Sequence, residues 1–323
     1  MDTNDNRNYG EIVNMKVLVT GGAGFIGSHV VDSCLAEGHE VVVIDDLSTG
    51  CRKNVNSKAK FYELDIQSQE VGSVFEQERP DYVNHLAAQI DVRRSLSEPI
   101  FDAKVNILGG INLLEQCVKH KVKKFIFAST GGAIYGQPES LPADEDSPPN
   151  PECHYAASKL SFEHYIELYQ RLYDLPFTIL RFPNVYGPRQ SPMGEAGVCS
   201  ILIGQMLDGI SPTLYGFGEP LRDYVFVGDI ARATVTALTK GDGETLNLGS
   251  GHGTSVLELF DTLKELLEFK GEPVLEPLRS GEIERVYLTG DRAEAVLGWH
   301  PEVNLREGLE QTIAHIRETL PIS

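Results

Sequence analysis

Short apolar runs alternate with longer amphipathic segments along the first half of the chain. Six of these short runs are predicted to be buried β-strands: residues 16–20, 41–45, 60–64, 81–86, 124–129 and 177–182. The segments between them, such as 26–38 and 105–120, show the apolar spacing of helices. This alternation predicts an α/β fold of the Rossmann type, a doubly wound parallel sheet with helices on both faces.

The pattern loosens after about residue 183 into loops, short strands and helices. We therefore predict an NAD-binding Rossmann domain over 15–183 and a smaller C-terminal α/β part over 184–323. The second part is expected to be mainly substrate-binding, with some segments returning to the sheet. Residues 253–271 form a clear helical pattern led by a Thr-Ser pair of candidate caps. The turn-rich segment 138–152 is predicted to be an active-site loop.

Residues 1–14 are polar and lack the apolar core of a signal peptide, so we expect a flexible extension before Met15. Whether Met1 or Met15 is the physiological start stays open. The 323 residues carry 47 Asp and Glu against 28 Lys and Arg, a net charge of -19. Nucleic acids and anionic membranes favour basic surfaces, so neither is an expected partner.

The cysteines and histidines carry no recognisable site pattern. Five scattered cysteines lack C-x-x-C spacing, and the histidines do not cluster. We expect neither a disulfide framework nor a metal site, and we expect a reducing, cytoplasmic location. No apolar run is long enough to span a bilayer.

The first predicted strand runs into a glycine-rich turn, TGGAGFIGSH. Gly22, Gly24 and Gly27 fit the pattern G-x-G-x-x-G, and Gly21, Gly24 and Gly27 also fit G-x-x-G-x-x-G. Glycine here allows a tight turn and lets backbone N–H groups approach a pyrophosphate. A strand before the turn and a helix after it are the context that a dinucleotide fingerprint requires.

The next strands end in residues that suit the same ligand. The second ends in Asp45 and Asp46, at the spacing of an acid that binds the adenine ribose and repels a 2′-phosphate, which favours NAD over NADP. At the third strand end an Asp could reach the adenine amino group, and at the fourth small residues would let a dinucleotide lie close; these residues are Asp65, Ile66, Leu86, Ala87 and Ala88. All lie at strand carboxyl ends, where open α/β sheets bind ligands.

CHYAASK places Tyr155 and Lys159 four residues apart, on one face of a predicted helix. A free phenol, with a pKa of about 10, is a poor base at neutral pH. A nearby ammonium and an oxidised nicotinamide favour the phenolate, which can take a proton from a hydroxyl. Together with the glycine turn, the pair indicates a dehydrogenase-type site.

From Met15 to about residue 317 the chain resembles the extended short-chain dehydrogenase/reductases, and within them the UDP-glucose 4-epimerase-like nucleotide-sugar epimerases. The resemblance rests on TGGAGFIGSH, VVVIDDLSTG, HLAAQIDVRRS, STGGAIYG, YAASK, LRFPNVYGPRQ, RDYVFVGD and LGWHP. It implies a tightly held NAD that is recycled during C4 epimerisation of a UDP-hexose through a 4-keto intermediate.

The resemblance also implies residue roles. Tyr155 would take the proton from the sugar O4, and Lys159 would hold the nicotinamide ribose and depress the Tyr155 pKa. The hydroxyl partner of Tyr155 falls at Ser129 or Thr130, and we favour Thr130. The other implied cofactor contacts, beside the glycines and strand-end residues named above, are Phe25, Ile26, Leu47, Thr49, Gly50 and Asn106.

Two glycines follow that hydroxyl pair. Related 4,6-dehydratases carry Asp-Glu at this place, and related decarboxylases carry a Glu. Gly131 and Gly132 supply neither an acid nor a base, so the resemblance implies oxidation and reduction at C4 without elimination. The glycines are also compatible with a simple strand-to-loop turn.

The diphosphate of the substrate requires cations and hydrogen-bond donors. By resemblance, Asn184, Arg222 and Arg279 would bind it. Val286 occupies the place of a bulky Tyr that, in some epimerases, lies against the sugar C2 side, so N-acetylated UDP-hexoses are also expected substrates. A register shift of one residue would make Tyr287 the gate instead.

Other functions stay open at this point. Arg93 and Arg94 raise a UDP-glucuronate 4-epimerase as the second candidate. A 4-ketosugar reductase and a non-catalytic NAD(H)-binding sensor are further alternatives. Family members commonly form homodimers through two helices, here expected around 97–119 and 153–173.

Overall fold

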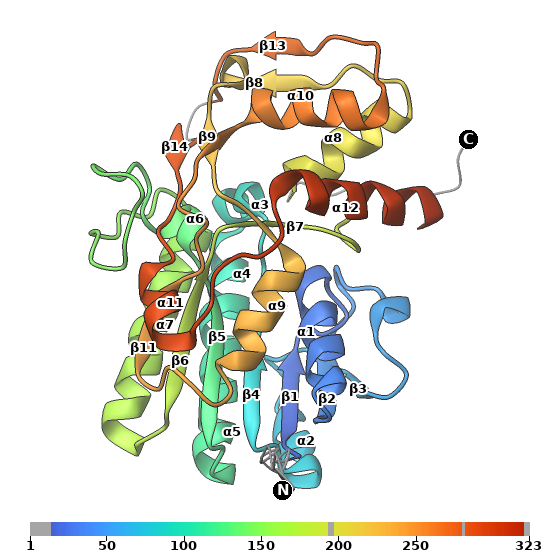
Figure 1. The fold of residues 1–323 in the computed structure, drawn as a ribbon. Coiled ribbons are helices and arrows are strands. Elements are labelled where there is room, and N and C mark those ends of the chain that lie inside the picture. The colour runs from blue at the N-terminus through green and yellow to red at the C-terminus, as the bar shows by residue number, and fades with distance from the viewer. Residues whose placement is uncertain (1–13, 193–196, 280–281, 320–323) are drawn as a thin grey trace, which may run out of the picture.

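The computed structural model describes residues 14–192, 197–279 and 282–319. The predicted N-terminal extension therefore lies outside the described residues except for its last position. A parallel sheet forms the middle layer, helices cover both of its faces, and a smaller C-terminal part packs above the carboxyl ends of its strands (Figure 1).

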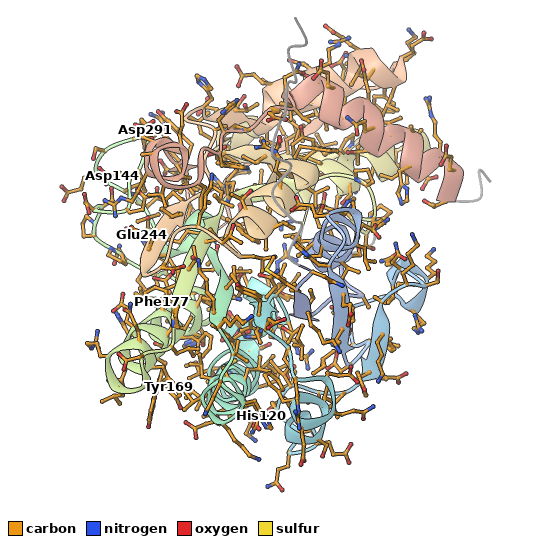
Figure 2. The ribbon with its side chains drawn as sticks, turned by 60° about the horizontal axis from the view of Figure 1, so that its bottom comes forward. His120, Asp144, Tyr169, Phe177, Glu244 and Asp291 are labelled. Carbon is orange, nitrogen blue, oxygen red and sulfur yellow. The ribbon has the colours of Figure 1, made fainter. Side chains whose placement is uncertain are left out.

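The central sheet has seven strands in the order β11-β6-β5-β4-β1-β2-β3, and every neighbouring pair is parallel. The strands are β1 (Lys16–Thr20), β2 (Glu40–Asp45), β3 (Lys60–Glu63), β4 (Tyr82–His85), β5 (Lys124–Thr130), β6 (Phe177–Phe182) and β11 (Glu244–Asn247). All six predicted strands are confirmed. The seventh, β11, comes from beyond residue 184 and pairs with β6, where Figure 2 labels Phe177 and Glu244.

Helices cover each face of the sheet and bury a separate apolar cluster. On one face lie α2 (Val71–Glu78), α5 (Gly110–His120) and α7 (His154–Tyr173), packed around Phe125, Phe127 and Phe162. On the other face lie α1 (Phe25–Ala36), α9 (Val227–Thr236) and α11 (Asp291–Leu297). The predicted Rossmann fold is thus confirmed, with α9, α11 and β11 built from the second half of the chain.

The C-terminal part has its own apolar cluster, which includes Phe260, Leu263 and Ile313. Its elements are β7 (Asn184–Tyr186), α8 (Val198–Leu207), β8 (Thr213–Tyr215), η3 (Gly216–Gly218), β9 (Leu221–Arg222), β10 (Tyr224–Phe226), β12 (Thr254–Ser255), α10 (Val256–Leu267), β13 (Val274–Glu276), β14 (Arg285–Val286) and α12 (Leu305–Thr319). The predicted helix is α10, and Ser255 caps it in a reciprocal box with Glu258.

Several short elements follow the carboxyl ends of β2, β4 and β5 along the chain. They are the 3₁₀ turn η1 (Arg52–Asn54), the helices α3 (Val92–Ser97), α4 (Pro99–Ala103) and α6 (Gly131–Ile134), and the π-helical turn η2 (Lys104–Gly109). Within the described ranges, no helix is both long and apolar enough to cross a membrane.

Candidate active site

The glycine-rich turn after β1 packs too tightly for side chains at three of its positions, Gly21, Gly22 and Gly27. Gly21 has a φ of +71°, and a Cβ on it would lie 2.7 Å from the backbone nitrogen of Ala87. A Cβ on Gly27 would lie 2.1 Å from the carbonyl oxygen of Gly21. The turn therefore brings the start of α1 directly against β1 and the loop after β4.

The N-terminus of α1 is open to an anion. Gly24 is the N-cap and provides no side-chain acceptor, and the first helical residues are Phe25, Ile26 and Gly27. The first turn of a helix leaves its N–H groups without partners inside the helix, and the helix dipole adds positive potential there. This donor set fits the pyrophosphate of a dinucleotide, which is the group the sequence predicts here.

Asp45, at the end of β2, ties the glycine turn to the loop that follows it. Its Oδ2 accepts from the N–H of Ala23 at 2.9 Å and its Oδ1 from the N–H of Leu47 at 2.8 Å. Burial raises the pKa of Asp45, whereas these two backbone hydrogen bonds lower it. Carboxylate oxygens accept several hydrogen bonds, so Asp45 keeps the capacity to bind a ribose.

The other predicted cofactor residues surround this turn. Gly50 packs directly against the Asp45 side chain, because a Cβ on Gly50 would lie 2.7 Å from Asp45 Oδ1. Asp46, Thr49 and Asp65 are exposed, Ile66 is buried, and Leu47, Leu86, Ala87 and Ala88 are half-buried. The N–H groups of Leu86 and Ala87 both donate to Thr20 Oγ1 at 3.2 Å, which fixes the loop after β4.

Asn106 holds that same loop from the other side. Its Oδ1 accepts from the N–H of Gln89 at 3.0 Å, and its Nδ2 donates to the carbonyl oxygen of Gln89 at 2.9 Å. Asn106 lies in the π-helical turn η2, a local distortion that often marks functional sites. Its side chain would therefore act on a cofactor through the position of the loop after β4.

Tyr155 and Lys159 lie one turn apart at the start of α7, beside the end of β5. Burial raises the pKa of the Tyr155 phenol, and the nearby Thr130 side chain opposes this shift. Lys159 Nζ donates to the carbonyl oxygen of Ala128 at 2.9 Å and lies 4.7 Å from the centre of the Phe127 ring. Burial lowers the pKa of Lys159 to about 7, and the charges of Asp102 and Glu163 oppose this shift.

The two predicted hydroxyls are used differently. Ser129 donates to Glu163, which also forms a buried, bidentate ion pair with Arg181 at 2.7 and 3.1 Å. Thr130 contacts the Tyr155 phenol instead. The structure thus gives Thr130 the position beside the phenol and gives Ser129 a place in the network that joins α7 to β5 and β6.

The two glycines after Thr130 differ in their surroundings. Neither has a positive φ, and both lie in α6, so the turn itself does not require glycine. A Cβ on Gly131 would lie 2.3 Å from Leu288 Cδ1, whereas a Cβ on Gly132 would lie 3.5 Å from Asn184 Oδ1. Leu288 therefore fills the place of a side chain at 131, and Asn184 faces position 132.

Both predicted substrate arginines interact with other groups of the protein. Arg222 donates to the carbonyl oxygens of Leu221, Ile283 and Glu284, and burial lowers its pKa. The Arg279 guanidinium lies 3.4 Å from the centre of the Tyr215 ring. Both belong to the C-terminal part, above the carboxyl edge of the sheet.

Val286 and Tyr287 point in different directions. Val286, opposite Arg222 in the β9–β14 pair, is buried in one cluster with Ile134 and Leu288. Tyr287 packs on Gly253, where an added Cβ would meet its ring at 2.6 Å. Val286 is thus the residue of the two that borders the segment after Thr130.

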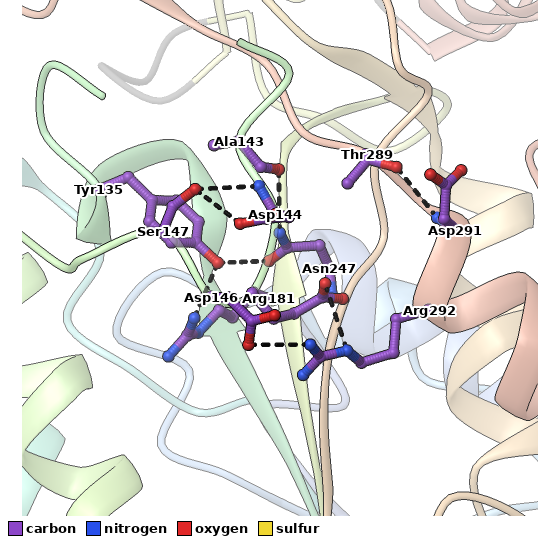
Figure 3. Close-up of polar contacts among 11 residues, drawn as sticks. Tyr135, Ala143, Asp144, Asp146, Ser147, Arg181, Asn247, Thr289, Asp291 and Arg292 are labelled. Carbon is purple, nitrogen blue, oxygen red and sulfur yellow. Dashed lines mark hydrogen bonds and ion pairs between the residues drawn. The ribbon is translucent and has the colours of Figure 1, made fainter. Parts of the chain in front are cut away.

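The loop 138–152 is anchored to the sheet through Asn247 at the end of β11 (Figure 3). Asn247 accepts from the Tyr135 hydroxyl at 2.9 Å, and its Nδ2 and N–H bind Ala143 and Glu145 of the loop. Arg292 of α11 pairs with Asp146 at 3.0 Å. The backbone of Ala143 also bonds to residues 287 and 289, so the loop supports the segment that carries Val286 and Leu288.

Three buried groups near the site had no signal in the sequence: Asp102, Glu163 and Arg181. Arg181 lies within a predicted strand. Glu163 lies one helical turn after Lys159, and this spacing points to the site only once the extent of α7 is known. Across residues 14–192, 197–279 and 282–319, no group of three His, Cys, Asp or Glu side chains is placed to hold a metal ion.

Known proteins match this arrangement over nearly the whole chain. A "Putative UDP-glucose 4-epimerase" of Methanocaldococcus jannaschii is 46% identical over 92% of this chain and 97% of its own length. The UDP-glucose 4-epimerase of Thermotoga maritima, solved with UDP-glucose, is 48% identical with a TM-score of 0.93 and covers 95% of this chain and 100% of its own. The Thermus thermophilus enzyme, solved with NAD, is 45% identical with a TM-score of 0.90 over the same shares.

The family model described as "NAD dependent epimerase/dehydratase family" matches residues 17–249, from β1 to just past β11. The chain belongs to this family.

Proposed function

We propose that this protein interconverts UDP-glucose and UDP-galactose by NAD-dependent epimerisation at C4. The observation that carries the proposal is the position of Tyr155, which contacts Thr130 at the carboxyl edge of the sheet with Lys159 one turn further along α7. The glycine turn at the start of α1 supports an NAD site beside this pair. The similarity to UDP-glucose 4-epimerases over more than nine-tenths of the chain supports the substrate.

In this mechanism Tyr155, as the phenolate, takes the proton from the sugar O4 and later returns it. Thr130 lies near the phenol, where its side chain lowers the phenol's pKa, and would orient it. Burial raises the pKa of Tyr155, so the phenolate requires positive charge nearby, which the Lys159 ammonium supplies. Bound NAD would supply an acceptor for the C4 hydride and a donor for its return to the other face.

The residues after Thr130 support epimerisation over elimination. Leu288 fills the space beside Gly131, and Gly132 carries no side chain. Neither position therefore supplies an acid or a base. The 4-keto sugar would therefore turn over in the site and be reduced again, without losing water.

The first test is to incubate the purified protein, without added cofactor, separately with UDP-glucose, UDP-N-acetylglucosamine and UDP-glucuronate. Proton NMR would follow the appearance of each C4 epimer. Formation of UDP-galactose supports the proposal and shows that NAD is retained and recycled. Turnover of UDP-glucuronate alone would make UDP-glucuronate the substrate, and bound NAD without turnover would indicate a sensor. In a separate assay with added NADH, steady consumption of NADH would indicate a reductase.

Arg93 and Arg94 both interact with other groups of the protein. Arg94 pairs with Glu98 at 3.2 Å and stacks on Phe101 at 4.0 Å, and Arg93 also has a partner. This ranks UDP-glucuronate below the neutral hexoses.

N-acetylated UDP-hexoses are further proposed substrates, because Val286 is small where it borders the segment after Thr130. Val286→Tyr is expected to abolish turnover of UDP-N-acetylglucosamine and to spare that of UDP-glucose. Tyr287→Phe, at the neighbouring position that faces Gly253, is the matched control and should spare both. Equal loss of both activities in Val286→Tyr would contradict the proposal that Val286 leaves room for the N-acetyl group.

We further propose a cytoplasmic homodimer. All five cysteines are free, which suits a reducing compartment. Large apolar side chains lie exposed on α4, η2 and α7: Ile100 is 74% exposed, Leu108 57% and Leu172 61%. An apolar surface of this kind marks an interface.

Light scattering tests the dimer directly. Ile100→Glu is expected to convert the dimer to a monomer. Leu275→Glu, which changes an apolar side chain that is 48% exposed on β13, should leave the mass unchanged. A monomeric wild-type protein would rule the dimer out.

A further inference from the structure

Asp102, in the short helix α4, is a fully buried carboxylate whose hydrogen-bond donors are all uncharged. Its Oδ1 accepts from Gln89 Nε2 at 2.9 Å and from Asn106 Nδ2 at 3.1 Å. Its Oδ2 accepts from Ser158 Oγ at 2.6 Å. An ionised carboxylate held only by neutral donors is costly in a protein interior, so its retention calls for a reason beyond packing.

These donors come from three elements that surround the candidate site. Gln89 belongs to the loop after β4, Asn106 to η2, and Ser158 to α7, directly before Lys159. Asp102 therefore joins the loop after β4, on the expected cofactor side, to the helix that carries Tyr155 and Lys159.

The charges around Lys159 single out Asp102. Two carboxylates act on Lys159, Asp102 and Glu163, and both favour its charged form. Glu163 is compensated, because Arg181 pairs with it through two hydrogen bonds and Ser129 donates to it. Asp102 accepts only from neutral groups, so its negative charge is the less compensated of the two.

The remaining groups facing Lys159 do not compete with this effect. His85, on β4, is buried and its pKa is held well below the ordinary value, so it is neutral near pH 7. From β5, Lys159 meets the Ala128 carbonyl and the Phe127 ring, which do not titrate. Tyr155, on the same helix, is the group whose proton the ammonium would influence.

We propose that Asp102 is a positioning residue, whose buried charge keeps Lys159 protonated beside Tyr155 and whose hydrogen bonds hold the loop after β4 against α7. The catalytic meaning of this charge rests on the proposed function. Burial lowers the pKa of Lys159 to about 7, and Asp102 is the larger of the two influences that raise it. Without this charge the amine would be neutral over more of the physiological range.

Asp102→Asn separates the charge from the hydrogen bonds. The amide oxygen can accept from Gln89 and Asn106, as Oδ1 does now. The amide nitrogen can donate to Ser158, because a hydroxyl accepts as well as donates. Ser158→Ala is the matched control, since it removes one of these hydrogen bonds and keeps the charge.

The test is a pH titration of Lys159 by NMR of protein carrying ¹³Cε-labelled lysine, with NAD at saturation. The Lys159 resonance is assigned by its loss in Lys159→Met. In Asp102→Asn the titration midpoint should fall by about half a pH unit or more, whereas Ser158→Ala should stay near wild type. The alkaline limb of the kcat–pH profile should move in the same direction, which lowers turnover about threefold on that limb.

Equal midpoints in wild type and Asp102→Asn would overturn the inference. So would failure of Asp102→Asn to fold, because the charge would then serve folding rather than Lys159. If the wild-type protein shows no epimerase activity while the Lys159 midpoint still falls in Asp102→Asn, the proposed function fails and the electrostatic link between the two residues stands.

Discussion

Gly131 and Gly132 lie side by side in α6, but the structure predicts opposite effects for the same substitution. A Cβ on Gly131 would lie 2.3 Å from Leu288 Cδ1, far inside the ordinary carbon–carbon contact of about 3.5–4 Å. Leu288 is 1% exposed and packed against Ile134 and Val286, so it has little room to move away. Overpacking of this kind costs about 1–3 kcal/mol.

The net magnitude includes the helix preference of alanine. Gly→Ala within a helix gains up to about 1 kcal/mol. Gly131→Ala should therefore lower the free energy of unfolding by about 1–2 kcal/mol. Gly132→Ala meets only Asn184 Oδ1, at an ordinary 3.5 Å, and should be neutral or stabilising by up to about 1 kcal/mol.

Urea unfolding followed by circular dichroism measures these free energies, and a double-mutant cycle identifies the cause. Leu288→Ala alone should cost about 2–5 kcal/mol, because it opens a cavity. In that background Gly131→Ala should no longer destabilise, because the clash is gone and the new methyl group fills part of the space. If Gly131→Ala costs the same in both backgrounds, or behaves like Gly132→Ala, the packing argument is refuted.

Two further predictions concern buried polar groups. Tyr135→Phe removes the hydroxyl that accepts from Arg181 Nη1 at 2.7 Å and donates to Asn247 Oδ1 at 2.9 Å. It should cost about 1–3 kcal/mol in urea unfolding, and a cost below about 0.5 kcal/mol would count against this network. Lys159 has a folded-state pKa of about 7 against an unfolded value of about 10.4, so the unfolded chain binds its proton more tightly. Wild-type stability, relative to Lys159→Met, should therefore rise between about pH 7 and 10, by roughly 1 kcal/mol per pH unit, and a flat difference would exclude the lowered pKa.

The strands and the order of the motifs could be predicted because their signals are local. Alternation of buried runs with amphipathic segments follows from the period of each element, and six strands were found this way. The glycine turn was also visible, because the positive φ and the close Ala87 backbone at Gly21 favour glycine there. The seventh strand was missed as a strand, since β11 lies where the alternation of strands and helices loosens and pairs with β6 across more than sixty residues of chain.

The sequence alone left the choice between Ser129 and Thr130 and between Val286 and Tyr287 unsettled. Adjacent residues in a strand point to opposite faces, so a one-residue uncertainty in register reverses the assignment. The structure gives Thr130 the contact with Tyr155 and turns Tyr287 toward Gly253.

The class of fold, the dinucleotide turn and the Tyr-x-x-x-Lys pair could be read from the chain, because each depends on residues close together along it. The groups that surround that pair became known only from the folded arrangement. Asp102 and Arg181 come from elements far from Lys159 in sequence, and their charges matter because folding places them in an interior of low dielectric. Leu288 likewise explains Gly131 only because the chain returns, more than 150 residues later, to fill the space beside it.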